Sequence, residues 1–326
     1  MKVLLAVFGV KIISKGNDQI LSKFGGNVDF LKLYHEFALH VLKNVWHWNR
    51  GDKPTLSLTC ISETLPILSE STREAYGFFD AGRNGDRFKV KDFNIETSEV
   101  THINPDHSSI REAFYYLQVP SGRSRGYLVL QVPEGQGIKH LVNHALNHYF
   151  KTKGLTSYRI EISNLINDKV FHRMMDTGFF RELILTKYGL PTELDSYNNN
   201  NSKPVVMKGT MKTIFQATDL SGSWKDKARS IFSLGRQKKT EGNSKIFVEI
   251  MDHKDDYDEV AIKLDLNGKQ KTFHVANNNR TLPDLDVTSN VNRKANGSLE
   301  LNDLLTQARE LIQDVSDKVE LDDIQN

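Results

Sequence analysis

The chain has little of what small secreted domains and membrane proteins depend on. Cys60 is its single cysteine among 326 residues, which excludes an intramolecular disulfide and a cysteine-only zinc cluster. No apolar run in the sequence approaches the roughly 20 residues needed to span a bilayer. The stretch Met1–Val10 is apolar like a signal peptide, but Lys11 interrupts it and no small-x-small cleavage pattern follows. We therefore expect a cytoplasmic protein with a buried first strand.

The charge of the chain is almost balanced. Its 43 Lys and Arg residues and 41 Asp and Glu residues give a formal net charge of +2 at pH 7. With 26% charged and 38% hydrophobic residues, the composition is that of an ordinary globular protein. A length of 326 residues allows two domains, each with its own core. Any attraction for a polyanion must therefore come from how the charge is distributed.

Residues 1–195 predict an α+β domain with a mixed sheet and flanking helices. Two apolar runs, 113–119 and 126–132, are joined by a short loop that contains glycine, so they predict a hairpin. Asn27 is expected to cap a helix, and the succession of strand, short helix and strand over 158–187 is typical of a crossover. The other expected elements are strands at 3–13, 55–61, 88–93 and 99–103, a turn at 82–85, and helices over 30–45 and 138–150.

An asparagine-rich run, residues 196–202, predicts the domain boundary because it has little to bury. A smaller domain of a hairpin and helices is expected over 203–326, with a basic helix first and an acidic helix last. Within it, Asn267-Gly268 is the preferred dipeptide of a type I′ turn. The register about this turn sets Leu264 opposite Lys271, Ile262 opposite Phe273 and Val260 opposite Val275.

Positive charge is concentrated just after the asparagine-rich run. Residues 203–239 hold nine Lys or Arg against Asp219 and Asp226, an excess of nine minus two, or +7. A helix capped by Ser223 and ended by Gly235 would expose most of its basic side chains. Such a helix is either merely solvated or tracks a phosphate backbone by counterion release. The candidate nucleic-acid contacts in this segment are Lys225, Lys227, Arg229, Arg236, Lys238 and Lys239.

A second basic patch is expected near the first hairpin. Arg123 and Arg125 lie in its loop without an acid beside them, and Lys139 opens the following helix. Forked guanidinium donors suit phosphate oxygens, although solvated turn arginines are common. The segment Gly135-Gln-Gly137 matches neither G-x-G-x-x-G nor the P-loop pattern, so it predicts a tight turn rather than a nucleotide site.

Three histidines, His140, His144 and His148, follow one another at intervals of four along the helix over 138–150. Two histidines four apart on a helix can share a metal, but no H-E-x-x-H pattern accompanies them. Three roles are therefore possible for these histidines: they are simply solvated, they face phosphates as a stripe, or they bind a metal. No cofactor is expected.

The last helix is expected over 299–319. Residues 297–326 carry eight acids against Arg309 and Lys318, an excess of −6. Its charge either neutralises the basic segment of the same domain or pairs with a second subunit. Its apolar face either forms a dimer or packs on its own core.

An enzymatic alternative rests on Glu249, Asp252 and Lys254, where a strand runs into an acid-x-Lys triplet. Such a cluster can hold magnesium in a nuclease, but the triplet also arises by chance in a charged chain. Cys60 lies in an expected buried strand, where a cysteine acts as a small hydrophobic residue rather than as a nucleophile.

The order of elements resembles a group of bacterial and prophage defence proteins of the RexA and KwaB (Kiwa) type. The resemblance covers roughly residues 75–190, is one of pattern, and includes no catalytic motif. It is carried by Ala113–Pro120, Arg125–Gln131, Gly135–Lys139, Tyr158–Ile162 and Leu183–Lys187.

The resemblance implies sequence-independent DNA binding in phage exclusion, as sensor or effector. We therefore expect a cytoplasmic homo-oligomer that binds nucleic acid, DNA rather than RNA, beside a second defence-system protein. A magnesium-dependent nuclease and a protein-interaction module are the alternatives.

Overall fold

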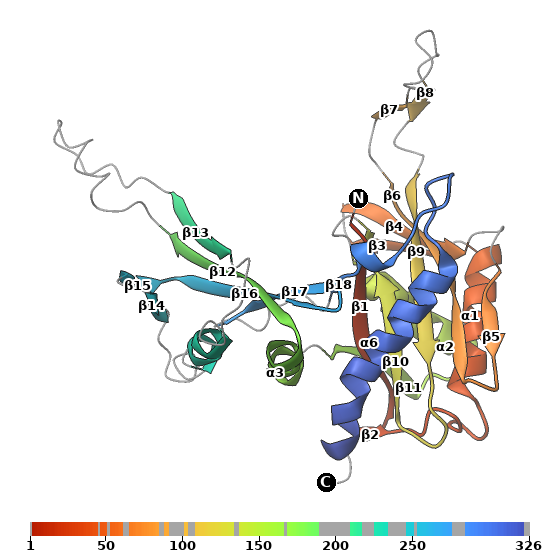
Figure 1. Ribbon diagram of the computed structural model, residues 1–326. Coiled ribbons are helices and arrows are strands. Elements are labelled where there is room, and N and C mark those ends of the chain that lie inside the picture. The colour runs from red at the N-terminus through yellow and green to blue at the C-terminus, as the bar shows by residue number, and fades with distance from the viewer. Residues whose placement is uncertain are drawn as a thin grey trace, which may run out of the picture. The chain divides into compact units, whose positions relative to one another are not determined.

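The chain is seen in a computed structural model (Figure 1). The structure describes residues 2–44, 46–50, 53–60, 65–84, 88–90, 101–103, 108–133, 137–165, 168–188, 209–216, 225–233, 246–250, 253–275 and 284–322. They fall into two compact units. Unit 1 combines Met1–Leu165 with Val291–Asn326, and unit 2 is Ile166–Asn290. Among the described helices, none is both long enough and apolar enough to cross a bilayer.

Unit 1 is built on an antiparallel sheet with the strand order β11-β1-β10-β9-β6-β4-β3. Two short strands extend it, β2 on β1 and β5 on β6, and β7 pairs with β8 in a separate hairpin. The strands are β1 (Leu4–Ser14), β2 (Asn17–Asp18), β3 (Trp46–Arg50), β4 (Lys53–Cys60), β5 (Ile67–Ser69), β6 (Glu74–Asn84), β7 (Phe88–Val90), β8 (Thr101–Ile103), β9 (Ser108–Gln118), β10 (Arg125–Gln131) and β11 (Tyr158–Asn164).

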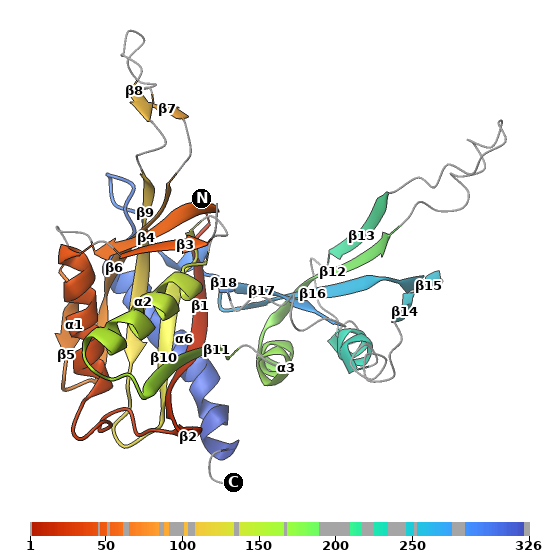
Figure 2. The ribbon, with the colours of Figure 1, turned by 180° about the vertical axis from the view of Figure 1, so that it is seen from behind.

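Helices cover both faces of this sheet (Figures 1 and 2). Helices α1 (Phe30–Lys43) and α2 (Lys139–Thr152) lie on one face, and α6 (Leu301–Asp322) lies on the other. Because successive strand residues point to opposite faces, β1 contributes Ala6, Phe8 and Val10 to the core under α1 and α2. Leu5 and Val7, which are also buried, belong to the face that α6 covers. A central strand buried on both sides reads as a continuous apolar run.

The start of α1 differs from the sequence expectation. Asp29, not Asn27, is the N-cap, and its carboxylate accepts a hydrogen bond from the backbone N–H of Leu31 at 3.0 Å. The same carboxylate is paired with Arg73, whose Nη2 lies 2.9 Å from Oδ1. The predicted cap at Asn27 is therefore wrong by two residues, and Asp29 is held in place by a residue distant in the sequence.

A polar cluster around the buried carboxylate of Glu74 connects α6 to the sheet. Arg309 of α6 donates to Glu74 of β6 through Nη2 at 2.7 Å and Nε at 3.2 Å. The hydroxyl of Tyr116 on β9 donates to the same carboxylate at 2.7 Å. The apolar side of α6, which includes Leu304, Ala308 and Leu311, is buried. The described part of this helix therefore packs on its own sheet, as one of the two sequence-based alternatives proposed.

In unit 2, antiparallel strands pair in the order β13-β12-β16-β17-β18. β14 and β15 form a separate hairpin, and α3 and a helical segment at 225–233 share a core with the strands of unit 2. The elements are α3 (Asp168–Thr177), β12 (Phe179–Tyr188), β13 (Thr210–Gln216), β14 (Ile246–Ile250), β15 (His253–Tyr257), β16 (Glu259–Leu266), β17 (Lys269–His274), β18 (Asp284–Asp286) and the 3-10 turn η4 (Thr288–Asn290).

The hairpin of β16 and β17 confirms the predicted turn and register. Asn267 and Gly268 have φ angles of 53° and 79°, as a type I′ turn requires. The predicted pairs Leu264 with Lys271 and Ile262 with Phe273 are observed, and the N–H of Val275 donates to the carbonyl of Val260 at 2.9 Å.

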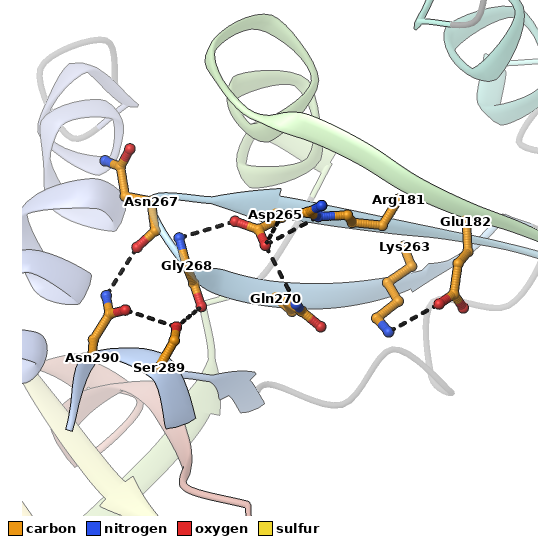
Figure 3. Close-up of polar contacts among 9 residues, drawn as sticks. All are labelled: Arg181, Glu182, Lys263, Asp265, Asn267, Gly268, Gln270, Ser289 and Asn290. Carbon is orange, nitrogen blue, oxygen red and sulfur yellow. Dashed lines mark hydrogen bonds and ion pairs between the residues drawn. The ribbon is translucent and has the colours of Figure 1, made fainter. Parts of the chain in front are cut away.

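Around this turn, Asp265 accepts bonds from Gly268, Arg181 and Gln270, as Figure 3 shows. On the other side of the turn, Asn290 donates to the carbonyl of Asn267 at 2.9 Å, and Ser289 donates to that of Gly268 at 3.1 Å.

The α+β class is observed, with corrections to its details. The strand pairs described within each unit are antiparallel rather than mixed. β11 pairs with β1, whereas β12 pairs with β13 and β16, so the expected crossover over 158–187 is wrong. The turn expected at 82–85 is wrong from Gly82 to Asn84, which continue strand β6, and Gly85 lies outside the described residues.

The two compact units divide the chain at other points than the expected domains 1–195 and 203–326. The divisions fall after Leu165 and after Asn290, so that α6 belongs with the first 165 residues. The asparagine-rich run 196–202 lies outside the described residues. Because α6 packs on a sheet whose strands lie far away in the sequence, local composition does not show that the last helix belongs to unit 1.

Candidate nucleic-acid interface

Three turns meet at one end of the unit 1 sheet, where β2 lies (Figures 1 and 2). The first joins β1 to β2, the second is the loop before α1, and the third joins β9 to β10. The N–H of Leu21 donates to the carbonyl of Arg123 at 2.9 Å, and the N–H of Gly122 donates to Ser22 Oγ at 3.2 Å. These bonds connect the second turn to the third.

The turns carry a concentration of cations, which we call the basic turn cluster and define as Lys11, Lys15, Lys23, Arg123 and Arg125. Lys11 lies opposite Arg125 in the β1–β10 pairing. The side chains of Lys15, Lys23 and Arg123 are exposed.

The turns that carry this cluster contain few acidic residues. Among residues 11–28 and 119–126 the one carboxylate is Asp18, which is paired with Lys11. Five cations minus one carboxylate leave an excess of +4. Glu161 of β11 lies opposite Lys11, but it is paired with Arg159 at 3.5 Å. The positive excess of the turns is therefore not cancelled by the neighbouring strand.

Glycine allows the close packing of these turns. Gly122 has a φ of 71°, which lies in the left-handed region that favours glycine. A Cβ on Gly126 would lie 3.0 Å from both the carbonyl oxygen of Gln118 and Cδ1 of Leu21. The second turn can therefore rest directly on β10, which brings Lys23 to the same end as Arg123 and Arg125.

The third residue of the predicted second patch lies elsewhere. Lys139 begins α2, and its Nζ lies 5.3 Å from the centre of the Phe8 ring, on the side of the sheet covered by α1 and α2. Burial lowers the pKa of Lys139, an effect that the charge of Glu161 opposes. On β10, Arg125 points to the same face of the sheet as Tyr127 and Val129, because alternate residues of a strand share a face. That face is the one covered by α6, opposite to Lys139. The structure therefore brings Arg123 and Arg125 together and leaves Lys139 apart.

The predicted basic helix is present as the helical segment 225–233 of unit 2. Ala228, Ile231 and Phe232 are buried, and the Phe232 ring stacks on Phe171 at a centroid distance of 3.6 Å. Its cationic residues Lys225, Lys227 and Arg229 are half-buried and flank this core face.

The cations of this segment differ in their surroundings. Arg229 is paired with Asp176 of α3 at 2.8 Å and with Asp226 at 2.7 Å, so its charge is already neutralised. Lys225 and Lys227 are half-buried and have no acidic partner among the described residues. Arg236, Lys238 and Lys239 lie outside the described residues.

The residues of the nuclease alternative lie at the β14–β15 hairpin. Glu249 is opposite Lys254 in the strand pairing, and Asp252 lies outside the described residues. The neighbouring Asp255 is paired with Lys187.

The acids that follow are also engaged. Asp258 accepts a bond from the backbone N–H of Tyr188 at 2.6 Å, and Glu259 accepts one from the Tyr188 hydroxyl. Within the described part of the chain, no group of three or more His, Cys, Asp or Glu side chains is arranged to hold a metal ion.

Sequence reasoning found Arg123 and Arg125 but missed Lys11, Lys15 and Lys23. These three lysines lie about 100 positions earlier in the chain, and each is unremarkable in its local sequence. The glycines near them signal turns, but only the pairing of β1 with β10 shows that the turns are neighbours.

Comparison with known proteins identifies no family for this chain. No protein-family model matches the chain, and no curated protein matches it. Function is therefore inferred from the placement of the charged side chains.

Proposed function

We propose that this protein binds nucleic acid through its phosphates, without preference for base sequence, and that the basic turn cluster supplies the main contact. The observation that carries the proposal is the excess of +4 in turns that hydrogen bonds hold together at one end of unit 1. Lysine and arginine on turns reach phosphate oxygens without entering a groove, and phosphate contacts carry no base information. Duplex DNA is the expected ligand.

Lys225 and Lys227 are proposed as a second contact in unit 2. Their half-buried stems leave two positive charges with no acidic partner among the described residues. Arg229 contributes less, because its guanidinium is shared between Asp176 and Asp226. An arginine held by two carboxylates must give up those contacts before it can bind a phosphate.

The acidic end of α6 is expected to moderate the affinity. This helix ends at the same end of unit 1 as the basic turn cluster (Figures 1 and 2). From Asp314 onward the sequence holds five acids against Lys318. Negative charge in the same chain repels a polyanion, so binding should be weaker than five cations alone would give.

The biological role proposed for this binding is antiphage defence. The resemblance of residues 75–190 to proteins of the RexA and KwaB type supports a sensor or effector that acts beside a second defence-system protein. A cytoplasmic homo-oligomer is part of this proposal. Expression in a phage-sensitive bacterium should lower plaque numbers, and a variant that has lost nucleic-acid binding should restore them.

The binding itself is tested by fluorescence anisotropy with a labelled duplex of arbitrary sequence. Neutralisation of about five phosphates should weaken binding by roughly 10²–10³ between 50 and 200 mM salt. Duplexes of unrelated sequence should bind equally well. Absence of binding at 50 mM salt would remove the proposal.

A further inference from the structure

Helix α2 presents a ladder of exposed histidines that the proposed nucleic-acid contact does not use. His140, His144 and His148 are exposed at successive intervals of four residues within an unbroken helix. The opposite side of α2 is packed in the core, with Val142, Leu146 and Phe150 fully buried. The backbone that carries the three imidazoles is therefore held in place by the fold.

The spacing suits chelation by neighbouring pairs. Residues four apart lie on the same side of a helix with Cβ atoms about 5–6 Å apart, so two rings can converge on one ion at Zn–N distances of about 2.0–2.1 Å. His140 and His148 are eight residues apart, or about 12 Å along the axis. They cannot share an ion, so every chelating pair must include His144.

The chemistry of the ladder selects a class of metal. Helix α2 contains no Asp or Glu, and no third His, Cys, Asp or Glu converges with a pair among the described residues. Oxygen-seeking ions such as Mg²⁺ and Ca²⁺ therefore find no protein ligand, whereas imidazole suits Zn²⁺, Cu²⁺ and Ni²⁺. Water would complete the coordination of such an ion.

We infer that α2 binds one divalent transition-metal ion of the zinc, copper and nickel class through His144 together with either His140 or His148. This site is separate from the basic turn cluster and does not depend on the proposed function. Only one ion binds per chain, because both pairs need the same imidazole. Trp46, whose ring lies 6.4 Å from that of His148, is placed to report the ion.

The test is a calorimetric titration of the full chain with Zn²⁺ or Cu²⁺ alone, which requires no other activity. Wild type should bind one ion to this ladder. His140→Ala and His148→Ala each leave one pair, so each should keep this binding with an affinity lower by about twofold, the statistical value of losing one of two equivalent arrangements. His144→Ala removes both pairs and should weaken binding by about tenfold or more.

A matched control is His47→Ala, which removes an exposed histidine of β3 and should leave the titration unchanged. Cu²⁺ should also quench tryptophan fluorescence in wild type and lose part of that quenching in Trp46→Phe. Equal effects of His140→Ala and His144→Ala would overturn the inference. So would wild-type binding that only His47→Ala removes. Circular dichroism of each variant shows whether the helix is intact.

Discussion

Glu74 is a buried carboxylate whose charge depends on two partners from different parts of the chain. Its side chain is 6% exposed, and Arg309 of α6 and Tyr116 of β9 both donate to it. Burial raises the pKa of Glu74, but the hydrogen bonds from Arg309 and Tyr116 outweigh burial and hold the pKa below its ordinary value of 4.5. Burial and the bond to Glu74 raise the pKa of Tyr116, which therefore stays protonated as the donor.

This contact predicts a pH-dependent contribution to stability. A carboxylate with a lowered pKa in the folded state stabilises the fold above its unfolded pKa, and the contribution is lost as the pH falls through the folded value. At pH 7, Glu74→Gln should lower the free energy of unfolding by about 1–3 kcal/mol. In urea titrations the difference from wild type should shrink once the pH falls below 4.5.

The surface pair of Lys153 and Glu36 offers a control, because both side chains are about half exposed. Glu36→Gln should cause a much smaller loss of stability at pH 7. A Glu74→Gln difference that stays constant from pH 7 to pH 3 would show that the carboxylate charge does not matter.

At the scale of elements, the hairpin of β16 and β17 depends on a turn that is held from both sides. Gly268 has a φ of 79°, and a Cβ there would lie 2.5 Å from Asn290 Oδ1 and 2.7 Å from Ser289 Oγ. Both side chains donate to carbonyls of the turn. An alanine would therefore introduce backbone strain and displace these hydrogen bonds.

Gly297 separates backbone strain from the loss of hydrogen bonds. Its φ is 85°, but a Cβ there would meet nothing within 4 Å. Gly297→Ala should cost about 1–2 kcal/mol for the left-handed conformation alone. Gly268→Ala should cost about 2–4 kcal/mol, because lost hydrogen bonds add to that strain. Thermal or urea unfolding of the two variants measures the difference, and equal losses would contradict the role of Ser289 and Asn290.

Strand β11 pairs with β1 on one side, and on its other side a side chain forms hydrogen bonds with its backbone. Asn147 of α2 accepts from the N–H of Ile160 at 3.0 Å and donates to its carbonyl at 3.2 Å. The amide thereby satisfies the backbone of β11 on the side away from β1 and connects the helix to the sheet.

Asn147→Ala should therefore reduce stability by about 1–3 kcal/mol, because two backbone groups lose their partner. Amide hydrogen exchange at Ile160 should accelerate in this variant relative to Glu161, whose N–H faces β1. Lys151→Ala removes an exposed side chain from the same helix and serves as the control. Unchanged exchange at Ile160 would show that the amide bond is not needed.

The elements also show where sequence reasoning is reliable. The hairpin at Asn267-Gly268 was predicted in register, because turn dipeptide and alternation are local signals that agree. Strand β6 was missed, because Gly82 interrupts its pattern and suggests a turn. Pairing with β4 on one side and β9 on the other holds this glycine in a strand, and neither partner can be identified from the segment itself.

At the scale of the whole molecule, unit 1 is completed by the last helix of the chain. Its sheet carries buried apolar residues on the α6 face, including Phe114 and Val129. A fragment of residues 1–195, which follows the sequence-predicted boundary, lacks α6 and leaves this face uncovered. We expect such a fragment to bind the dye ANS strongly and to aggregate, whereas the full chain does neither. A monomeric fragment that does not bind the dye would contradict the role of α6.

The candidate site shows the same dependence on distant residues. Arg123 and Arg125 were predicted from a loop without acids, but two arginines are a weak signal. Lys11, Lys15 and Lys23 join them only because β1 pairs with β10 and the loop before α1 packs on the β9–β10 turn. Arg229 shows the reverse error. The sequence predicted a phosphate contact, but its guanidinium is paired with Asp176 of another helix.

The most direct test of the basic turn cluster is the salt dependence of duplex binding in two matched variants. Lys15→Ala with Lys23→Ala and Arg123→Ala removes three cations of the cluster. Lys43→Ala with Lys294→Ala and Lys2→Ala removes three exposed cations elsewhere in unit 1. The slope of log K against log salt should fall by about 2–3 in the cluster variant, since each lost phosphate contact lowers it by about 0.9. The control should keep the wild-type slope, and equal slopes in both variants would contradict the account.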